Sequence, residues 1–277
     1  MKEKHLRGKT ALITGSGRGI GQAIANHLAF CGANVIIHDV AMDSPKIFNE
    51  GDSVEQVADK IGKENSVKTM FVLGDLTKPD IVSSMVENIH SQFGQIDILV
   101  PCAGADISSK GETGPNAGKL LDPLLAINIS NEDIKAILER NLLTCIYTCK
   151  AVVPEMIERK YGWVVVMGSV SATWASPEQA IYGTAKAAVH QYARNLAAMC
   201  RPYGVYVNII APGMTLSGRF KASRELNKDL LRKTGSLDRY CWPEEVGQTV
   251  GFLVSEDASF ISGQIIRIDG GKQIWPA

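Results

Sequence analysis

A tyrosine and a lysine stand four residues apart, Tyr182 and Lys186, in the stretch IYGTAKAAVHQY. Its composition is helical, and side chains four residues apart share one face of a helix. A free tyrosine has a pKa of about 10. An ammonium about 4 Å away contributes about 4 kcal/mol at an effective dielectric of about 20, enough to bring that pKa to about 7. The pair predicts a proton-transfer tyrosine, although Tyr-x3-Lys alone is also a common surface pair.

A glycine-rich loop, TGSGRGIG at 14–21, follows a short apolar strand and precedes a helix. Its glycines permit a tight turn and let backbone amides approach a pyrophosphate, and the helix adds the positive end of its dipole. Asp39 closes the next strand, 18 residues after Gly21. A carboxylate there would accept hydrogen bonds from a ribose 2′-hydroxyl and repel a 2′-phosphate. The pattern predicts a dinucleotide site.

Arg18 favours NADP over NAD, because a guanidinium could bind the 2′-phosphate of NADP. A carboxylate in the ribose pocket imposes a repulsive cost, whereas an arginine on the rim can turn to solvent. We therefore expect Asp39 to dominate and NAD to be preferred over NADP.

Small or acidic residues end two further strands. Asp75 ends the third strand, where it could serve a turn or meet the adenine amino group, and Ala103 and Gly104 end the fourth, where they would permit close approach of a cofactor. The full expected set of cofactor-binding residues is Gly15, Arg18, Gly19, Ile20, Gly21, Asp39, Asp75, Leu76, Ala103, Gly104, Tyr182, Lys186, Thr215 and Ser217.

Short β-branched runs and helical periods alternate along the chain and must position these residues. The expected strands are 10–14, 34–39, 68–75, 97–104, 162–169, 205–213 and 264–269, and the expected helices are 20–31, 53–62, 79–93, 131–159, the one that carries Tyr182, and 243–255. Continuous apolar strands indicate burial on both faces, which is typical of a parallel sheet between helix layers. This predicts a single doubly wound α/β domain, a Rossmann fold, over residues 1–277.

Two long segments, 105–132 and 214–240, follow strands directly and therefore belong to the edge of the sheet where ligands bind. Loops of this length are usually functional, although variable surface insertions are also possible. We expect 214–240 to fold over the nicotinamide as a lid, with Thr215 and Ser217 near its carboxamide.

Composition excludes several classes of function. The 277 residues carry 29 basic and 29 acidic side chains, so no global field favours nucleic acid or an anionic membrane. The charged start MKEKHLRGK has no apolar signal region, and no run is long enough for a spanning helix. The six cysteines form no CxxC and no zinc-ligand spacing. A reduced, cytoplasmic protein without a metal is expected.

The joint pattern resembles the short-chain dehydrogenase/reductase family. The matching features are TGxxxGxG at 14–21, Asp39, Ser169 thirteen residues before Tyr182, Lys186, and Pro-Gly at 212–213. The resemblance implies a catalytic tetrad of Asn141, Ser169, Tyr182 and Lys186, a seven-stranded sheet and a homotetramer. It also implies that Lys186 holds the nicotinamide ribose and that Asn141 holds a water that relays protons.

Ser169 would stabilise charge on the reacting oxygen, although Ser171 lies close enough in sequence to compete for that role. The chain departs from the family at 101–104, where it reads Pro-Cys-Ala-Gly in place of Asn-Asn-Ala-Gly and lacks an asparagine that ties the sheet together. The segments after Asp39 and Gly104 also look longer than usual.

We predict an NAD-dependent oxidoreductase of a secondary alcohol or ketone, with Ser169, Tyr182 and Arg219 contacting substrate. The lid holds six basic residues from Met214 to Lys233 against two acidic ones. If Arg219 turns inward it could clamp an anion, whereas a solvated amphipathic helix explains the same charges. A small polar substrate is expected, such as a sugar, polyol or hydroxy acid. Alternatives are an NADPH-dependent 3-oxoacyl-carrier-protein reductase and a dinucleotide-sensing binding protein.

Apolar residues lie on more than one face of two helices, which favours association into the homotetramer. They are Ile146, Val152, Val153 and Met156 on the helix near 133–159, and Ala187, Val189, Ala193 and Leu196 on the helix of Tyr182. The tail GGKQIWPA is expected near a neighbouring subunit.

Overall fold

Seven parallel strands form one sheet in the order β3-β2-β1-β4-β5-β6-β7 in the computed structural model, which describes residues 4–112 and 115–274. The strands are β1 (Thr10–Ile13), β2 (Asn34–Asp39), β3 (Thr69–Leu73), β4 (Ile98–Val100), β5 (Gly162–Met167), β6 (Val205–Pro212) and β7 (Ile265–Ile268). Each lies within one of the predicted strands. The order reverses between β1 and β4, which creates the crevice where this fold binds ligands.

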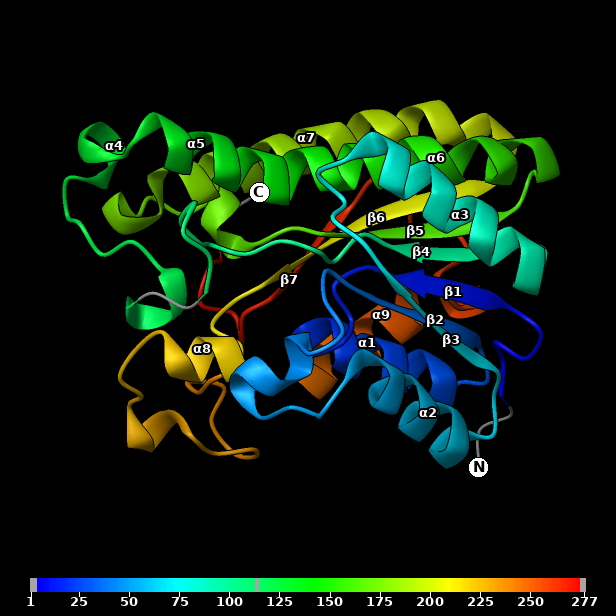
Figure 1. Ribbon diagram of the computed structural model, residues 1–277, viewed down its shortest axis with the longest axis horizontal. Coiled ribbons are helices and arrows are strands. Elements are labelled where there is room, and N and C mark those ends of the chain that lie inside the picture. Colours follow the sequence, from blue (N-terminus) through cyan, green and yellow to red (C-terminus); the bar gives the residue numbers. More distant parts are fainter. Residues whose placement is uncertain (1–3, 113–114, 275–277) are drawn as a thin grey trace.

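Helices cover both faces of the sheet (Figure 1). The helices α1 (Gly19–Phe30), α2 (Val54–Asn65) and α9 (Pro243–Leu253) cover one face, and α3 (Pro79–Phe93), α6 (Thr144–Arg159) and α7 (Ala180–Cys200) cover the other. Successive strand residues point to opposite faces, so Ile13 joins one core and Leu12 the other. Both cores are apolar, as the continuous apolar strands predicted.

The helix expected over 131–159 is divided by a local change of winding. It consists of α5 (Asn131–Leu138), a π-helical turn (Glu139–Leu143) and α6. A π turn inserts one extra residue into a helix and is frequent at functional sites. Asn141 lies in this turn, so the one polar residue singled out in that helix also marks its irregular part.

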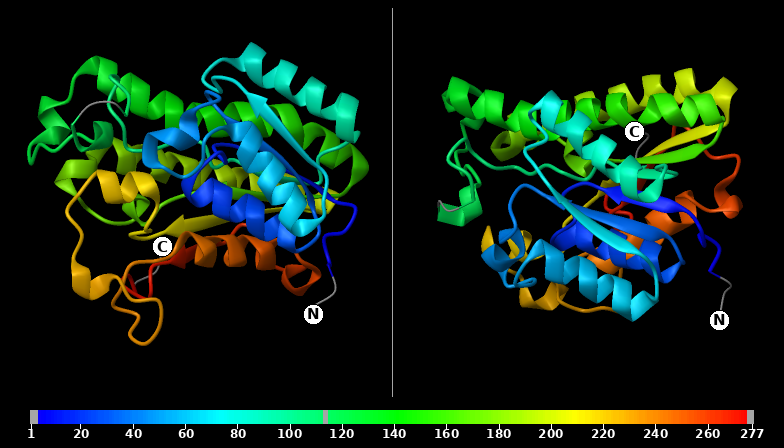
Figure 2. Two further views of the ribbon diagram at one scale, coloured as in Figure 1. Left: turned by 60° about the horizontal axis from the view of Figure 1, so that its bottom comes forward. Right: turned by 45° about the vertical axis from the view of Figure 1, so that its right-hand side comes forward.

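The two long segments lie at the same end of the sheet, beyond the carboxyl ends of the strands, in Figure 1 and in both views of Figure 2. The first contains a turn η2 (Pro115–Gly118) and the short helix α4 (Leu125–Asn128). The lid, residues 214–240, contains α8 (Gly218–Ala222) and a turn η7 (Lys228–Leu230). A 3-10 turn after β2, η1 (Ser44–Phe48), packs against α8 and was not predicted.

Most of the apolar helix residues that favoured a tetramer are buried within their own chain, so they do not support association. Six of the eight residues pack into the core of their own chain, beneath α6 and α7: Val152, Val153, Met156, Val189, Ala193 and Leu196. Ile146 is only half-buried and Ala187 is exposed. In the tail, Gln273 is buried against its own chain, where it accepts a hydrogen bond from Thr173, and residues 275–277 lie outside the described part.

Within residues 4–112 and 115–274, no helix is long and apolar enough to cross a membrane. No cluster of metal-ligating side chains occurs in the same residues. Within the described residues the six cysteines form no disulfide, and four of them are buried.

Candidate active site

One cavity of about 1320 Å³ lies at the carboxyl edge of the sheet. Its walls contain nearly every residue that the sequence singled out: Gly15, Arg18, Gly19, Ile20, Gly21, Asp39, Asp75, Leu76, Ala103, Gly104, Ser169, Tyr182, Lys186, Thr215, Ser217 and Arg219. Asn141 lies behind this wall, 1% exposed. Residues from far apart in the sequence therefore share one space.

The glycine loop leaves no room for side chains. Gly15 has a φ of +63°, and a Cβ there would lie 2.9 Å from Ala103 Cα. A Cβ on Gly21 would lie 2.2 Å from Gly15 O. The N-cap residue of α1, Arg18, makes no side-chain hydrogen bond to the helix start, so this residue does not block the approach of an anion. This bare backbone at a helix start fits the pyrophosphate of a dinucleotide.

An anionic group already accepts a hydrogen bond at this helix start. Gly19 N donates to Glu50 Oε2 at 3.0 Å, and Glu50 Oε1 accepts from Gly218 N at the same distance. The carboxylate thus links the cofactor loop to the lid. Nothing in the local sequence indicated this role, because Glu50 lies in the irregular segment after Asp39.

Asp39 is 6% exposed at the end of β2. Its Oδ1 accepts the amide of Val40 at 2.8 Å, and its Oδ2 would be only 2.7 Å from a Cβ on Gly17. The carboxylate is therefore held beside the glycine loop, where the ribose of a dinucleotide would bind. Its position fits the sequence-based expectation.

Arg18 does not turn to solvent as expected. Its Nη2 lies 2.5 Å from Glu112 Oε2, and its guanidinium stacks 4.8 Å from the centroid of the Phe48 ring. A charged group that has both an ion pair and an aromatic partner stays inside the cavity. Glu112 belongs to the long segment after β4, so sequence spacing gave no sign of this contact.

His38 and Asp75 support the loop from the neighbouring strands. Gly15 N donates to His38 Nδ1 at 3.1 Å, which leaves Nε2 to donate to Gly74 O at 3.0 Å. Burial lowers the pKa of His38, so the ring is neutral. Asp75 Oδ1 accepts from the amide and hydroxyl of Thr77 at 3.0 and 2.8 Å, so its turn role is present.

Tyr182 and Lys186 come from the first turns of α7. Lys186 Nζ donates to Met167 O at 3.0 Å and lies 5.8 Å from the centroid of the Tyr182 ring. Burial raises the pKa of Tyr182 to about 12, and the Asp106 carboxylate adds to this, while Ser169 and Arg219 oppose it. The expected lowering of the tyrosine pKa is therefore not found, because burial dominates and Lys186 is not among the groups that shift this pKa.

Ser169, and not Ser171, faces the tyrosine. The Ser169 side chain hydrogen-bonds Tyr182 and also accepts from Ser171 N at 3.1 Å. The Ser171 hydroxyl donates to Gln179 at 2.9 Å. Ser169 N donates to His190 Nε2 at 3.4 Å, and burial lowers the pKa of His190 to about 4, which keeps the ring neutral. His190, one turn beyond Lys186, was not singled out from sequence.

Asn141 is fixed from two sides. Its Nδ2 donates to Ala105 O and Ile137 O, both at 2.9 Å. Its Oδ1 is buried and has no hydrogen-bond partner among the described residues. A Cβ on Gly104 would lie 2.6 Å from that oxygen, so only glycine fits there. The π turn thus presents an unsatisfied acceptor behind the cavity wall.

The altered segment at 101–104 is tied to the sheet in another way. Thr14 Oγ1 accepts from Cys102 N and Ala103 N, both at 3.0 Å. One threonine hydroxyl on the cofactor loop therefore holds the segment that follows β4.

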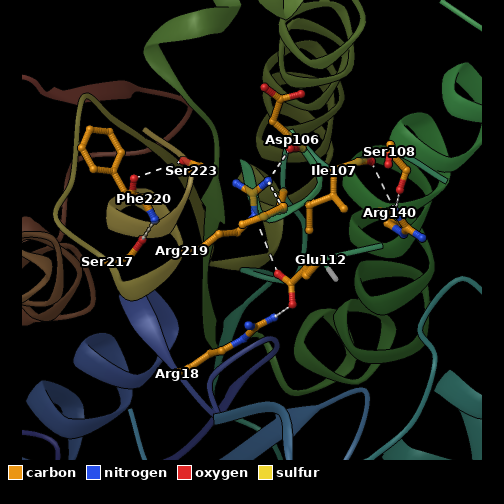
Figure 3. Close-up of polar contacts among 12 residues, drawn as sticks. Arg18, Asp106, Ile107, Ser108, Glu112, Arg140, Ser217, Arg219, Phe220 and Ser223 are labelled. Atoms are coloured by element: carbon orange, nitrogen blue, oxygen red, sulfur yellow. Dashed lines mark hydrogen bonds and ion pairs between the residues drawn. The ribbon is translucent and has the colours of Figure 1, made fainter. Parts of the chain in front are cut away.

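In the lid, only two of the six basic side chains turn inward. Arg219 and Arg224 are half-buried, and the others are exposed. The guanidinium of Arg219 donates to Asp106 O and, at 3.4 Å, to Ala117 O, and its Nε lies 3.7 Å from Glu112 Oε1 (Figure 3). Arg219 turns inward as expected, but its partners are protein groups.

The other two lid residues expected near the cofactor have structural roles. Thr215 is buried and its hydroxyl donates to Gly213 O at 3.1 Å. Ser217 caps α8 by accepting the amide of Phe220 at 3.2 Å. Both line the cavity, so a contact with the carboxamide is compatible with these roles.

Comparison with known proteins agrees with this arrangement. A family model described as enoyl-(acyl carrier protein) reductase matches residues 15–273. Cyclohexanol dehydrogenase of Rhodococcus sp. is 34% identical over 272 residues, with 96% of each chain covered. A 3-oxoacyl-[acyl-carrier-protein] reductase of Chlamydia trachomatis is 30% identical over 263 residues, with 95% of this chain and 96% of the relative covered.

Among solved structures, 7α-hydroxysteroid dehydrogenase complexed with NADH and 7-oxo glycochenodeoxycholic acid has a TM-score of 0.80. It is 27% identical and covers 97% of this chain and 96% of its own. The chain therefore belongs to the short-chain dehydrogenase/reductase family. Within this family it is an oxidoreductase that acts on an alcohol or ketone, and a nicotinamide dinucleotide is the cofactor typical of the family.

Proposed function

We propose that the protein transfers hydride between NAD(H) and a secondary alcohol or its ketone, with Asn141, Ser169, Tyr182 and Lys186 as the catalytic residues. The observation that carries the proposal is the shared cavity, in which the glycine loop and the Ser169–Tyr182 pair face one space. When bound, the nicotinamide supplies the acceptor for a hydride from the carbinol carbon.

In the oxidation direction, ionised Tyr182 takes the proton of the substrate hydroxyl, and the oxygen becomes a carbonyl oxygen as a hydride leaves the carbinol carbon. Ser169 donates a hydrogen bond to that oxygen as charge develops on it. Lys186, which is buried and bound to Met167 O, has two further donors that can hold the nicotinamide ribose. The Oδ1 of Asn141, which has no partner among the described residues, is suited to hold a water that relays protons from Lys186.

The NAD preference rests on Asp39. A buried carboxylate beside the glycine loop attracts ribose hydroxyls and repels a 2′-phosphate at short range. Arg18 Nη2 is paired with Glu112, whereas its Nη1 is buried without a hydrogen-bond partner among the described residues. The proposed preference for NAD over NADP is therefore assigned to Asp39.

The substrate is proposed to be small and polar. Arg219 and Arg18 share Glu112, and each also has a buried guanidinium nitrogen without a hydrogen-bond partner among the described residues. The cavity wall carries charged side chains of both signs, which disfavours a purely apolar substrate such as an unsubstituted ring. This supports a sugar, polyol or hydroxy acid, and the two guanidinium groups are compatible with an anionic group on it.

A 3-oxoacyl-carrier-protein reductase is the second candidate, favoured by the 30% identical relative of that name. Four exposed basic lid residues, Lys221, Lys228, Arg232 and Lys233, could meet an acidic carrier protein. Such enzymes would need NADPH, which Asp39 opposes. The non-enzymatic alternative is a protein that senses dinucleotides and turns over no substrate. The complete tetrad argues against it.

The test is a turnover assay of secondary alcohols and ketones with NAD(H) and with NADP(H), followed as nicotinamide absorbance. We expect activity with NAD, loss of turnover in Tyr182→Phe with cofactor binding retained, and loss of both in Lys186→Ala. Turnover by the Tyr182→Phe variant at the native rate would contradict the mechanism. Reduction of an acyl-carrier-protein thioester with NADPH, and not of simple ketones, would establish the second candidate.

A further inference from the structure

A buried carboxylate, Asp106, stands in the cavity two residues after Gly104 and belongs to none of the motifs above. Its side chain is 8% exposed overall, and its Oδ2 has no hydrogen-bond partner among the described residues. In Figure 3 the carboxylate points away from Arg219, whose hydrogen bond goes to the main-chain oxygen of Asp106. A buried acceptor without a partner costs free energy unless a ligand satisfies it.

Asp106 lines the same cavity as Ser169 and Tyr182. Its charge is the second largest cause, after burial, of the raised pKa of Tyr182. Burial raises the pKa of the Asp106 carboxyl. The charges of Lys119, Arg219 and Arg224 and a hydrogen bond from the Gln179 side chain oppose this rise, and Oδ2 is the oxygen left without a partner. A substrate whose carbinol meets Tyr182 therefore brings its neighbouring atoms towards this carboxylate.

The cations near Asp106 have other partners as well. Lys119 Nζ lies 3.6 Å from Glu178, and the guanidinium of Arg224 lies 3.9 Å from the centroid of the Phe220 ring. Together with Arg219 they compensate the charge of Asp106 without filling its Oδ2. These cations would repel an ammonium ligand, and the carboxylate would repel an anionic ligand. A neutral hydroxyl donor avoids both repulsions.

We propose that Asp106 accepts a hydrogen bond from a second hydroxyl of the substrate, next to the hydroxyl that Tyr182 deprotonates, and so makes the enzyme selective for vicinal diols and polyols. This inference rests on the proposed alcohol oxidation. A site built to accept a hydrogen bond discriminates strongly against an analogue that lacks the donor, because the buried acceptor is then left unpaired. Asp106 thus determines specificity, whereas the tetrad performs the chemistry.

The test compares matched alcohols with NAD: cyclohexanol against trans-cyclohexane-1,2-diol, and 2-butanol against 2,3-butanediol. In the native enzyme kcat/KM should be higher for each diol. In Asp106→Asn and Asp106→Ala the diol-to-alcohol ratio of kcat/KM should fall by about 10- to 100-fold, the size expected for a hydrogen bond to a charged acceptor. Asp80→Asn, the same change at an exposed carboxylate on α3 outside the cavity lining, is the matched control and should leave the ratio within about twofold.

The outcomes separate the two proposals. Native oxidation of the mono-alcohols with no gain for the diols, or an equal loss on both in the Asp106 variants, overturns the role of Asp106 and leaves the oxidoreductase proposal standing. A higher kcat/KM for 2-aminocyclohexanol than for the diol also overturns it, because the site would then bind a cation. No turnover of any alcohol by the native enzyme overturns both. Circular dichroism and NAD binding of each variant exclude misfolding as the cause.

Discussion

The Arg18 side chain of the cofactor loop and the Glu112 side chain of the segment after β4 form an ion pair, with Nη2 and Oε2 2.5 Å apart. The two side chains are only 18% and 12% exposed, so solvent screens the pair weakly. Glu112 also lies 3.7 Å from Arg219 of the lid (Figure 3). One carboxylate therefore joins the cofactor loop and the lid across the cavity.

This pair predicts a second determinant of cofactor choice. Glu112→Gln should release Arg18 towards a 2′-phosphate and raise kcat/KM with NADP by about 5- to 10-fold, because one charged partner is lost. Steady-state kinetics with both cofactors measure the effect. The gain should vanish in the double variant Arg18→Ala/Glu112→Gln. An equal gain with and without Arg18 would mean that Glu112 acts on the cofactor by another route.

Asp39 should set most of the preference. Replacing Asp39 by Ser removes both the acceptor for the ribose hydroxyls and the repulsion of a 2′-phosphate. We expect the NAD-to-NADP ratio of kcat/KM to fall by about 10- to 100-fold. The control is Asp43→Ser, a carboxylate of the same segment that lies outside the cavity lining. A ratio that stays constant in Asp39→Ser would place the selectivity elsewhere.

The rate of oxidation should depend on pH through Tyr182. Burial and Asp106 raise the pKa of Tyr182 to about 12, so the ionised base becomes more populated as pH rises. The profile of kcat/KM should therefore increase towards alkaline pH. In Asp106→Asn the carboxylate charge is gone, and the rising limb should move to lower pH. A limb that moves to higher pH, or not at all, would show that Asp106 does not act on the phenol.

Asn141 should affect turnover more than cofactor binding. Asn141→Ala removes two hydrogen bonds and the unpartnered Oδ1. We expect kcat to fall at least tenfold and the free energy of unfolding to fall by about 1–3 kcal/mol. NAD affinity should stay within about threefold, because Asn141 does not line the cavity. Denaturant unfolding and fluorescence titration measure these quantities. Full kcat in a destabilised variant would assign Asn141 a purely structural role.

Assembly is the remaining prediction. The family resemblance favours a homotetramer, and Ala187 is exposed on α7 where a neighbour could pack. Light scattering at micromolar concentration should give a mass of four chains, and Ala187→Glu should lower it because a charge would be buried at the contact. A monomer for the native chain would contradict this prediction.

Much of the framework followed from local sequence. Alternation of apolar strands with helical periods is a property of each segment, and all seven strands lie where this pattern placed them. Residues at strand ends, such as Asp39 and Ser169, were predictable as site residues because parallel strands end at one edge. The irregular segments were identified only as long loops, since their structure depends on contacts with distant elements.

Sequence alone determined the fold, because alternating apolar strands and helical periods are local properties of each segment. It also predicted the cofactor loop from glycine spacing and the tetrad from the family resemblance. Tertiary structure alone decided what surrounds these groups. It brought Glu112 to Arg18, 94 positions apart, and Arg219 to the Asp106 carbonyl, 113 positions apart. It also raised the pKa of Tyr182, which spacing to Lys186 had led us to expect lowered. Electrostatic environment depends on burial and on charges from distant segments, which local spacing does not specify.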